Sequence, residues 1–197
     1  MSGPRQSVLW VGGWGIPEQW GLDTVRAHFP DADHQWRIPS ANALESLDAY
    51  DHVVGYSLGA SLLLRANAGS SAVLLAPFVD FKSESRQGGR ISSTQLRYVR
   101  RSMAADPVAA LNDFYVRAGL AIQTTGLPYA REVLDWGLNQ LLADVPRHDA
   151  HRSCAIVGVD DPLLDPSAIL PHFAELEAIQ DAKHDLAGLL PELSIKI

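Results

Sequence analysis

The sequence has only one cysteine and no long hydrophobic run. Cys154 has no second cysteine to pair with, and its apolar neighbours Ala155, Ile156 and Val157 indicate a buried strand position rather than an activated thiol. Apolar stretches such as Ala72–Pro77 are far shorter than the ~20 residues of a membrane-spanning helix. We therefore expect neither a disulfide nor a transmembrane helix.

Basic residues are also scarce: 16 lysines and arginines stand against 23 aspartates and glutamates, a formal net charge of −7. Binding to nucleic acid depends on a basic surface that neutralises phosphates, so we expect no nucleic-acid partner. The segment Met1–Gln6 carries one arginine, and the apolar run Val8–Val11 is too short for a signal peptide. These features predict a cytoplasmic protein.

The 197 residues, 47% of them hydrophobic, suit a single domain spanning 1–197. Short apolar, β-branched runs alternate with helical patterns, which predicts a reduced doubly wound parallel sheet of about six strands. The predicted strands are Ser7–Val11, His34–Ile38, His52–Gly55, Ala72–Ala76, Cys154–Gly158 and Leu176–Ile179. The predicted connecting helices are Ile16–Phe29, Ala41–Leu47, Leu58–Asn67 and Ser167–Phe173.

This alternation stops over residues 78–147, where helical patterns continue but no convincing strand is found. The expected helices of this segment are Thr94–Ala104, Pro107–Ala118 and Pro128–Leu142. We interpret residues 78–147 as a helical cap inserted into the domain.

A candidate nucleophile lies in Gly55-Tyr56-Ser57-Leu58-Gly59, between a predicted strand and a predicted helix. In this G-x-S-x-G pattern the serine occupies a strained turn, and the two glycines allow close approach of neighbouring backbone. A purely structural turn is the alternative. The strand before it and the helix after it favour a nucleophilic Ser57.

A serine nucleophile needs a base and an acid, and in this strand-and-helix context both follow it in the chain. His184 follows the last predicted strand and precedes a short predicted helix, Leu186–Leu193, so it is the predicted base. Asp161, in the acidic loop after Cys154–Gly158, is the predicted acid. Asp160 and Asp165 remain alternatives, since any of the three could instead cap a helix or a turn.

Acyl transfer also needs donors for a developing oxyanion. The backbone N–H of Leu58, next to the nucleophile, is one candidate. The other is the N–H of Trp14 in the loop Gly12-Gly13-Trp14-Gly15, where the glycines allow it to turn toward the serine. A plain glycine-rich turn is the competing interpretation.

Two groups of side chains in the cap are candidates for substrate contact. Arg97, Arg100 and Arg101 would share one face of a helix and could meet an acidic partner, although a solvated helix face is the favoured explanation for them. Aromatic residues could line an apolar pocket or simply pack in the core. From these we select Phe78, Phe114 and Tyr115 as substrate-binding candidates.

These motifs resemble the pimeloyl-acyl-carrier-protein methyl ester esterases of biotin synthesis, within the α/β-hydrolase superfamily. The similarity spans most of the chain and includes Gly13-Trp14-Gly15, the Ser57 motif, Gly158–Leu163, Ala182-Lys183-His184 and the cap segment Val133–Leu138. One departure is Gly12, which stands where that family usually has histidine. The resemblance implies an α/β-hydrolase fold.

The resemblance further implies a Ser57–His184–Asp161 triad, Trp14 and Leu58 as oxyanion donors, and cap arginines that contact an acyl carrier protein. The expected activity is hydrolysis of the methyl ester of pimeloyl-acyl carrier protein, with no metal or organic cofactor. The alternatives are a general small carboxylesterase or thioesterase, and a catalytically inactive hydrolase fold that acts as a binding module.

Overall fold

A computed structural model of the chain describes residues 5–66, 72–145 and 151–193. Its main sheet has six parallel strands in the order β2-β1-β3-β4-β7-β8. Their bounds are β1 Ser7–Val11, β2 Asp33–Arg37, β3 His52–Tyr56, β4 Val73–Leu75, β7 His151–Gly158 and β8 Phe173–Ile179. All six predicted strands are confirmed, each within a few residues of its expected bounds.

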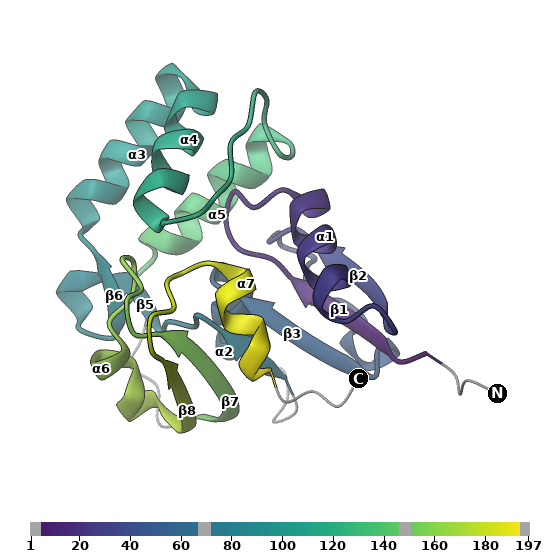
Figure 1. Cartoon of the computed structure of the whole chain (residues 1–197). Helices are drawn as coiled ribbons and strands as arrows, with labels where there is room; N and C mark the ends of the chain where they lie inside the picture. The colour runs from purple at the N-terminus through teal and green to yellow at the C-terminus, as the bar shows by residue number, and fades with distance from the viewer. Residues whose placement is uncertain (1–4, 67–71, 146–150, 194–197) are drawn as a thin grey trace.

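The chain reverses its direction of travel across the sheet next to β1, as in a doubly wound fold (Figure 1). Helices α1 (Glu18–His28) and α7 (Leu186–Leu189) contact each other in front of the sheet, and α2 (Leu58–Arg65) lies behind it. Helix α6 (Pro166–Ile169) precedes β8. The last residue of the predicted helix Leu58–Asn67 lies outside the described residues.

Residues Ala41–Leu47 do not form the predicted helix. Their backbone makes successive turns, with bonds from Ala43 N to Ser40 O and from Glu45 N to Asn42 O, and a 3₁₀ turn follows at Leu47–Ala49. The guanidinium of Arg37 donates to the carbonyls of Ala43 and Glu45, acceptors that a helix would use for its own bonds. Ser46, with a positive φ of 52°, also interrupts any helix here.

Between β4 and β7 lie three helices, α3 (Ser93–Ala105), α4 (Pro107–Ala118) and α5 (Arg131–Leu142), as predicted. We call them the cap helices. A capping box formed by Ser92 and Gln95 starts α3, and the side chain of Asp106 caps α4. Figure 1 shows the three helices gathered beyond one edge of the sheet. Residues 146–147 of the predicted cap lie outside the described part of the chain.

The expectation that residues 78–147 contain no strand is wrong. Strands β5 (Asp80–Lys82) and β6 (Gly88–Ile91) pair in a small separate sheet. The sequence does not predict these strands, because β5 buries the charged residues Asp80 and Lys82 and β6 begins with two glycines in place of apolar residues. A Cβ on Gly89 would lie 1.8 Å from the carbonyl oxygen of Phe81, so the pairing needs glycine there.

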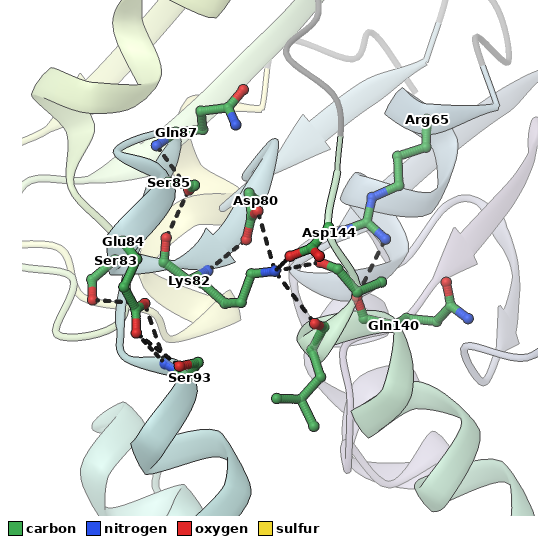
Figure 2. Close-up of polar contacts among 12 residues, drawn as sticks. Arg65, Asp80, Lys82, Ser83, Glu84, Ser85, Gln87, Ser93, Gln140 and Asp144 are labelled. Carbon is green, nitrogen blue, oxygen red and sulfur yellow. Dashed lines mark hydrogen bonds and ion pairs between the residues drawn. The ribbon is translucent and has the colours of Figure 1, made fainter.

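An ion-pair cluster, in which Asp80 and Lys82 are buried and Asp144 is exposed, ties this small sheet to the residues after α5 (Figure 2). The Lys82 ammonium donates to the carbonyls of Leu142 (3.3 Å) and Ala143 (2.9 Å) and pairs with the carboxylates of Asp80 and Asp144. A cation at this place satisfies carbonyls that the end of a helix leaves free. The end of α5 is thereby held against the small sheet.

The longest described helix, α3, has 13 residues, and no described helix combines the length and hydropathy that a membrane span requires. Cys154 is half-buried on β7, where burial first and the neighbouring Glu175 and Glu177 second raise the pKa of its thiol. This agrees with the prediction that the thiol is not activated.

Candidate active site

Ser57 lies at the sharp turn between β3 and α2, with φ 55° and ψ −116°, a strained conformation for a residue that is not glycine. The two flanking glycines explain why the turn is possible. A Cβ on Gly59 would lie 2.0 Å from the carbonyl oxygen of Val11, and one on Gly55 would lie 2.6 Å from the Cα of Ala60. The close contacts of this motif therefore hold the serine hydroxyl at the end of β3.

His184 approaches Ser57 from the loop after β8, and its Nε2 lies 2.9 Å from the Ser57 Oγ. Its ring is 2% exposed, whereas Ser57 is partly open to solvent. The buried Tyr56 hydroxyl donates to the backbone carbonyl of His184 at 2.6 Å, which fixes the position of this loop. The predicted base and nucleophile, 127 residues apart, are thus within hydrogen-bond distance.

Asp161 is fully buried and lies 2.7 Å from His184 Nδ1 through its Oδ2. Its Oδ1 accepts from the backbone N–H groups of Leu163 (2.8 Å) and Leu164 (3.0 Å). Both oxygens act as acceptors, so Nδ1 of His184 carries the proton and Nε2 is free to accept the serine proton. This arrangement can make Ser57 nucleophilic.

Of the competing carboxylates, Asp160 is exposed and Asp165 caps α6 by accepting from the Ser167 N–H at 3.0 Å. The side-chain hydrogen bond from Ser167 holds the pKa of Asp165 below its usual value. The geometry therefore selects Asp161 among the three candidates.

The loops that carry acid and base are joined directly. Val159 N donates to Ile179 O at 2.9 Å, and Asp160 N donates to Ala182 O at 3.0 Å. A Cβ on Gly158 would lie 2.3 Å from the Ala182 carbonyl oxygen, so this glycine permits the close approach. The neighbouring strands β7 and β8 thus bring Asp161 and His184 together.

The residues Gly13–Ile16 form a turn beside Ser57, closed by a bond from Ile16 N to Gly13 O. Gly15, in the third position, has φ 75°, as a type II turn requires. A Cβ on Gly13 would be 3.1 Å from the Ser57 Cβ. Within the described residues, the N–H groups of Trp14 and Leu58 donate to no other group, and Leu58 opens α2. Both are free to bind an oxyanion.

Gly12 leaves space that Trp36 fills: a Cβ there would lie 2.6 Å from the Trp36 indole. A histidine at this position would collide with that side chain. The packing of Trp36 therefore accounts for glycine at position 12.

An apolar cavity of about 220 Å³ lies among the cap helices. Trp14 from the turn Gly13–Ile16 and Leu163 from the loop after β7 form part of its wall, and the substrate-binding candidate Phe114 also lines it. Its other apolar lining residues are Phe81, Ile91, Leu96, Val99, Leu138 and Leu141. Phe78 and Tyr115 are not in its wall. Phe78 is fully buried against Phe81, and the Tyr115 hydroxyl donates to the carbonyl of Gly15.

The three predicted arginines all lie exposed on α3. Arg101 lines the cavity, together with Arg117 of α4, while Arg100 donates to the side chain of Asn139 on α5. Sequence reasoning missed Arg117, which carries no motif and reaches the cavity only through the packing of α3 against α4. No cluster of three or more potential metal ligands occurs among residues 5–66, 72–145 and 151–193.

No protein-family model and no curated protein matches this chain. Solved structures do. The chain is similar to the bottromycin epimerase BotH bound to bottromycin A2 (TM-score 0.64, 14% identity, 98% of this chain and 89% of the other). It is also similar to a putative lipase from Acinetobacter baumannii AYE (TM-score 0.56, 13% identity, 91% and 77%).

Naproxen esterase from Bacillus subtilis is a third similar structure (TM-score 0.52, 16% identity, 96% of this chain and 81% of the other). An epimerase stands beside a lipase and an esterase in this group, so the fold does not decide the reaction. The parallel six-stranded sheet with its flanking helices, together with these likenesses, shows that the chain has the α/β-hydrolase fold.

Proposed function

We propose that this protein is a serine esterase in which Ser57 is the nucleophile, His184 the base and Asp161 the orienting acid. The observation that carries the proposal is the continuous hydrogen-bonded chain from the Ser57 Oγ through the His184 ring to the Asp161 carboxylate, with distances of 2.9 and 2.7 Å. The lipase and the esterase among the similar structures support the same class of reaction.

In the proposed reaction, His184 Nε2 takes the Ser57 proton as the Oγ attacks the ester carbonyl carbon. The carbonyl π electrons move to the oxygen, which the N–H groups of Trp14 and Leu58 stabilise. His184 then gives its proton to the departing alkoxide, and an alcohol leaves. Water, deprotonated by His184, attacks the acyl carbon of the acyl-serine; the bond from this carbon to the Ser57 Oγ then breaks as His184 gives its proton to Oγ, and the acid product and free Ser57 result.

For the substrate, we propose the methyl ester of pimeloyl-acyl carrier protein. The apolar cavity of about 220 Å³ exceeds the ~150 Å³ that holds a benzene molecule, and would take part of an acyl chain. The exposed guanidinium groups of Arg97, Arg100 and Arg101 would face an acidic carrier protein. A general small carboxylesterase or thioesterase is the second candidate, because the cavity suits a short acyl group equally well.

The ester-hydrolysis proposal is tested with the purified full-length chain, p-nitrophenyl esters of two to eight carbons, and a fluorophosphonate probe. We expect turnover and labelling at Ser57, and loss of both in Ser57→Ala with an unchanged thermal unfolding midpoint. Ser102→Ala, a serine on α3 outside the site, is the matched control. A well-folded wild type that neither labels nor turns over any ester would instead favour a binding module.

The carrier-protein proposal is tested by replacing Arg97, Arg100 and Arg101 singly with glutamate. We expect KM for methyl pimeloyl-acyl carrier protein to rise several-fold in each variant, while turnover of p-nitrophenyl butyrate stays at the wild-type level in the variants of Arg97 and Arg100, which do not line the cavity. Arg26→Glu on α1 makes the same charge change away from the cap. Equal rates for all four variants on the carrier substrate would leave the general esterase as the better proposal, as would failure to complement a biotin-requiring strain that lacks its own esterase.

A further inference from the structure

The turn Gly13–Ile16 is held by two tyrosine hydroxyls of the cap, one on each side of Gly15. The N–H of Gly15 donates to the Tyr129 hydroxyl at 2.6 Å, and the Tyr115 hydroxyl donates to the carbonyl oxygen of Gly15. Tyr115 lies on α4, and Tyr129 lies in the segment before α5. The polar groups of one glycine are thus paired with two separate parts of the cap.

A third bond from the cap fixes the neighbouring side chain. The Trp14 indole N–H donates to the carbonyl of Leu134 on α5 at 2.8 Å, and its ring meets Phe114 edge-on at 4.9 Å. Three consecutive groups of the turn, namely the Trp14 indole and both polar groups of Gly15, therefore depend on the cap for their partners.

These bonds control where the backbone N–H of Trp14 points. The Gly13 carbonyl, in the same planar trans peptide as that N–H, faces Ile16, so the N–H faces the other way. The direction of this N–H can still change through the backbone dihedrals of Trp14 and Gly15. Glycines at positions 13 and 15, with a third at position 12 just before the turn, give the backbone little intrinsic stiffness. Bonds to the two peptide groups that follow Trp14 remove that freedom.

The tyrosines are suited to this role because they stay neutral. Burial raises the pKa of Tyr115 and of Tyr129 above the ordinary range, so each hydroxyl keeps its proton through the working pH range. Tyr115 can thus donate to the Gly15 carbonyl, and Tyr129 can accept from the Gly15 N–H without placing a buried negative charge beside the oxyanion.

We propose that Tyr115 and Tyr129 are positioning residues that hold the Trp14 N–H in the geometry that binds the oxyanion. This inference rests on the proposed esterase function, and it makes the cap part of the catalytic apparatus as well as a cover for the acyl group. Removing a whole oxyanion donor costs about 10²–10³ in kcat, so loosening one donor should cost less.

The test compares Tyr129→Phe and Tyr115→Phe with the wild type, using p-nitrophenyl butyrate. We expect kcat to fall about tenfold in each variant with KM nearly unchanged, since the hydroxyls act on the transition state and not on the acyl group. Affinity for an aryl trifluoromethyl ketone, which adds to Ser57 and leaves an oxyanion, should fall by a similar factor. Tyr50→Phe is the matched control, because it too removes a hydrogen-bonded tyrosine hydroxyl. The partners of Tyr50 are the side chains of Gln35 and Arg37 on β2, and β1 separates this strand from β3.

Thermal unfolding of every variant separates a folding defect from a positioning defect, and either tyrosine variant suffices if the other does not fold. Full kcat and full ketone affinity in folded Tyr129→Phe and Tyr115→Phe would overturn this inference and leave the esterase proposal standing. A wild type with neither ester turnover nor fluorophosphonate labelling would overturn both.

Discussion

Replacing Asp161 with asparagine tests the inferred proton positions of the triad. In the native site Oδ1 accepts from the N–H groups of Leu163 and Leu164, and Oδ2 faces His184 Nδ1. The asparagine oxygen must take the place of Oδ1, because an amide NH₂ there would face two donors. Its NH₂ group then points at Nδ1 of His184, which must become the acceptor, and the imidazole proton moves to Nε2.

An Nε2–H group donates to the Ser57 hydroxyl and cannot accept its proton. A wrong tautomer of this kind costs about 10⁴ in kcat, or ~5 kcal/mol of transition-state stabilisation. The expected loss for Asp161→Asn is therefore about ten-thousandfold on p-nitrophenyl butyrate, with little change in unfolding temperature since both backbone bonds persist. Asp160→Asn and Asp165→Asn are matched controls that should keep near-normal turnover. A variant Asp161→Asn that keeps a tenth of wild-type kcat would refute the reasoning.

Three further predictions concern stability. Gly59→Ala places a Cβ 2.0 Å from the Val11 carbonyl and should lower the free energy of unfolding by about 1–3 kcal/mol or more in urea titrations, whereas Gly126→Ala, with nothing within 4 Å, should lower it by far less. Lys82→Met removes the cation beside buried Asp80 and should lower the free energy of unfolding by about 3–5 kcal/mol. The double variant with Asp80→Asn should recover part of this loss. If the losses of the two single variants simply add in the double variant, the ion pair does not stabilise the fold. Burial raises the pKa of Tyr56, Tyr115 and Tyr129 in the folded state, so their contribution to stability is complete below the unfolded value of about 10 and is lost as the pH rises toward the folded values. Thermal unfolding midpoints should fall steeply above about pH 10, and a flat profile to pH 12 would contradict the burial of these hydroxyls.

The nucleophile and its turn could be predicted because their constraints are local. Gly55 and Gly59 stand two residues from Ser57 and are required by contacts that any strand-to-helix turn of this kind makes. The four central strands β1, β3, β4 and β7 could be predicted for a similar reason, since a strand buried on both faces needs a run of apolar residues, whereas the edge strands β2 and β8 are largely polar or exposed. The choice among Asp160, Asp161 and Asp165 could only be ranked, because three aspartates within six residues fit the same sequence pattern and only the hydrogen bond to His184 distinguishes them.

The elements that sequence reasoning got wrong depend on contacts with residues outside their own segments. Strand β5 carries Asp80 and Lys82, two charged residues that a sequence pattern assigns to the surface. They are buried because the end of α5, some sixty residues later, supplies carbonyl acceptors for the Lys82 ammonium. The segment Ala41–Leu47 has a helical pattern, but Arg37 competes for its carbonyls. No local propensity encodes either contact, so tertiary interactions decide both.

The candidate active site also has two parts that differ in what holds them in place, namely the triad and the turn Gly13–Ile16. The triad residues occupy loops at the ends of β3, β7 and β8 that the parallel sheet places, and β6 adds bonds from the Arg90 guanidinium to the Asp161 carbonyl (2.9 Å) and from the Arg90 N–H to the Leu163 carbonyl (2.8 Å). The turn Gly13–Ile16 differs, because glycine gives it little stiffness of its own and its bonding partners Tyr115, Tyr129 and Leu134 lie on α4, on α5 and in the segment between these helices. Phe114, which packs on Trp14, is also a wall of the apolar cavity. A group that fills the cavity therefore presses on Trp14, the proposed oxyanion donor, and variation of the acyl chain should alter kcat as well as KM.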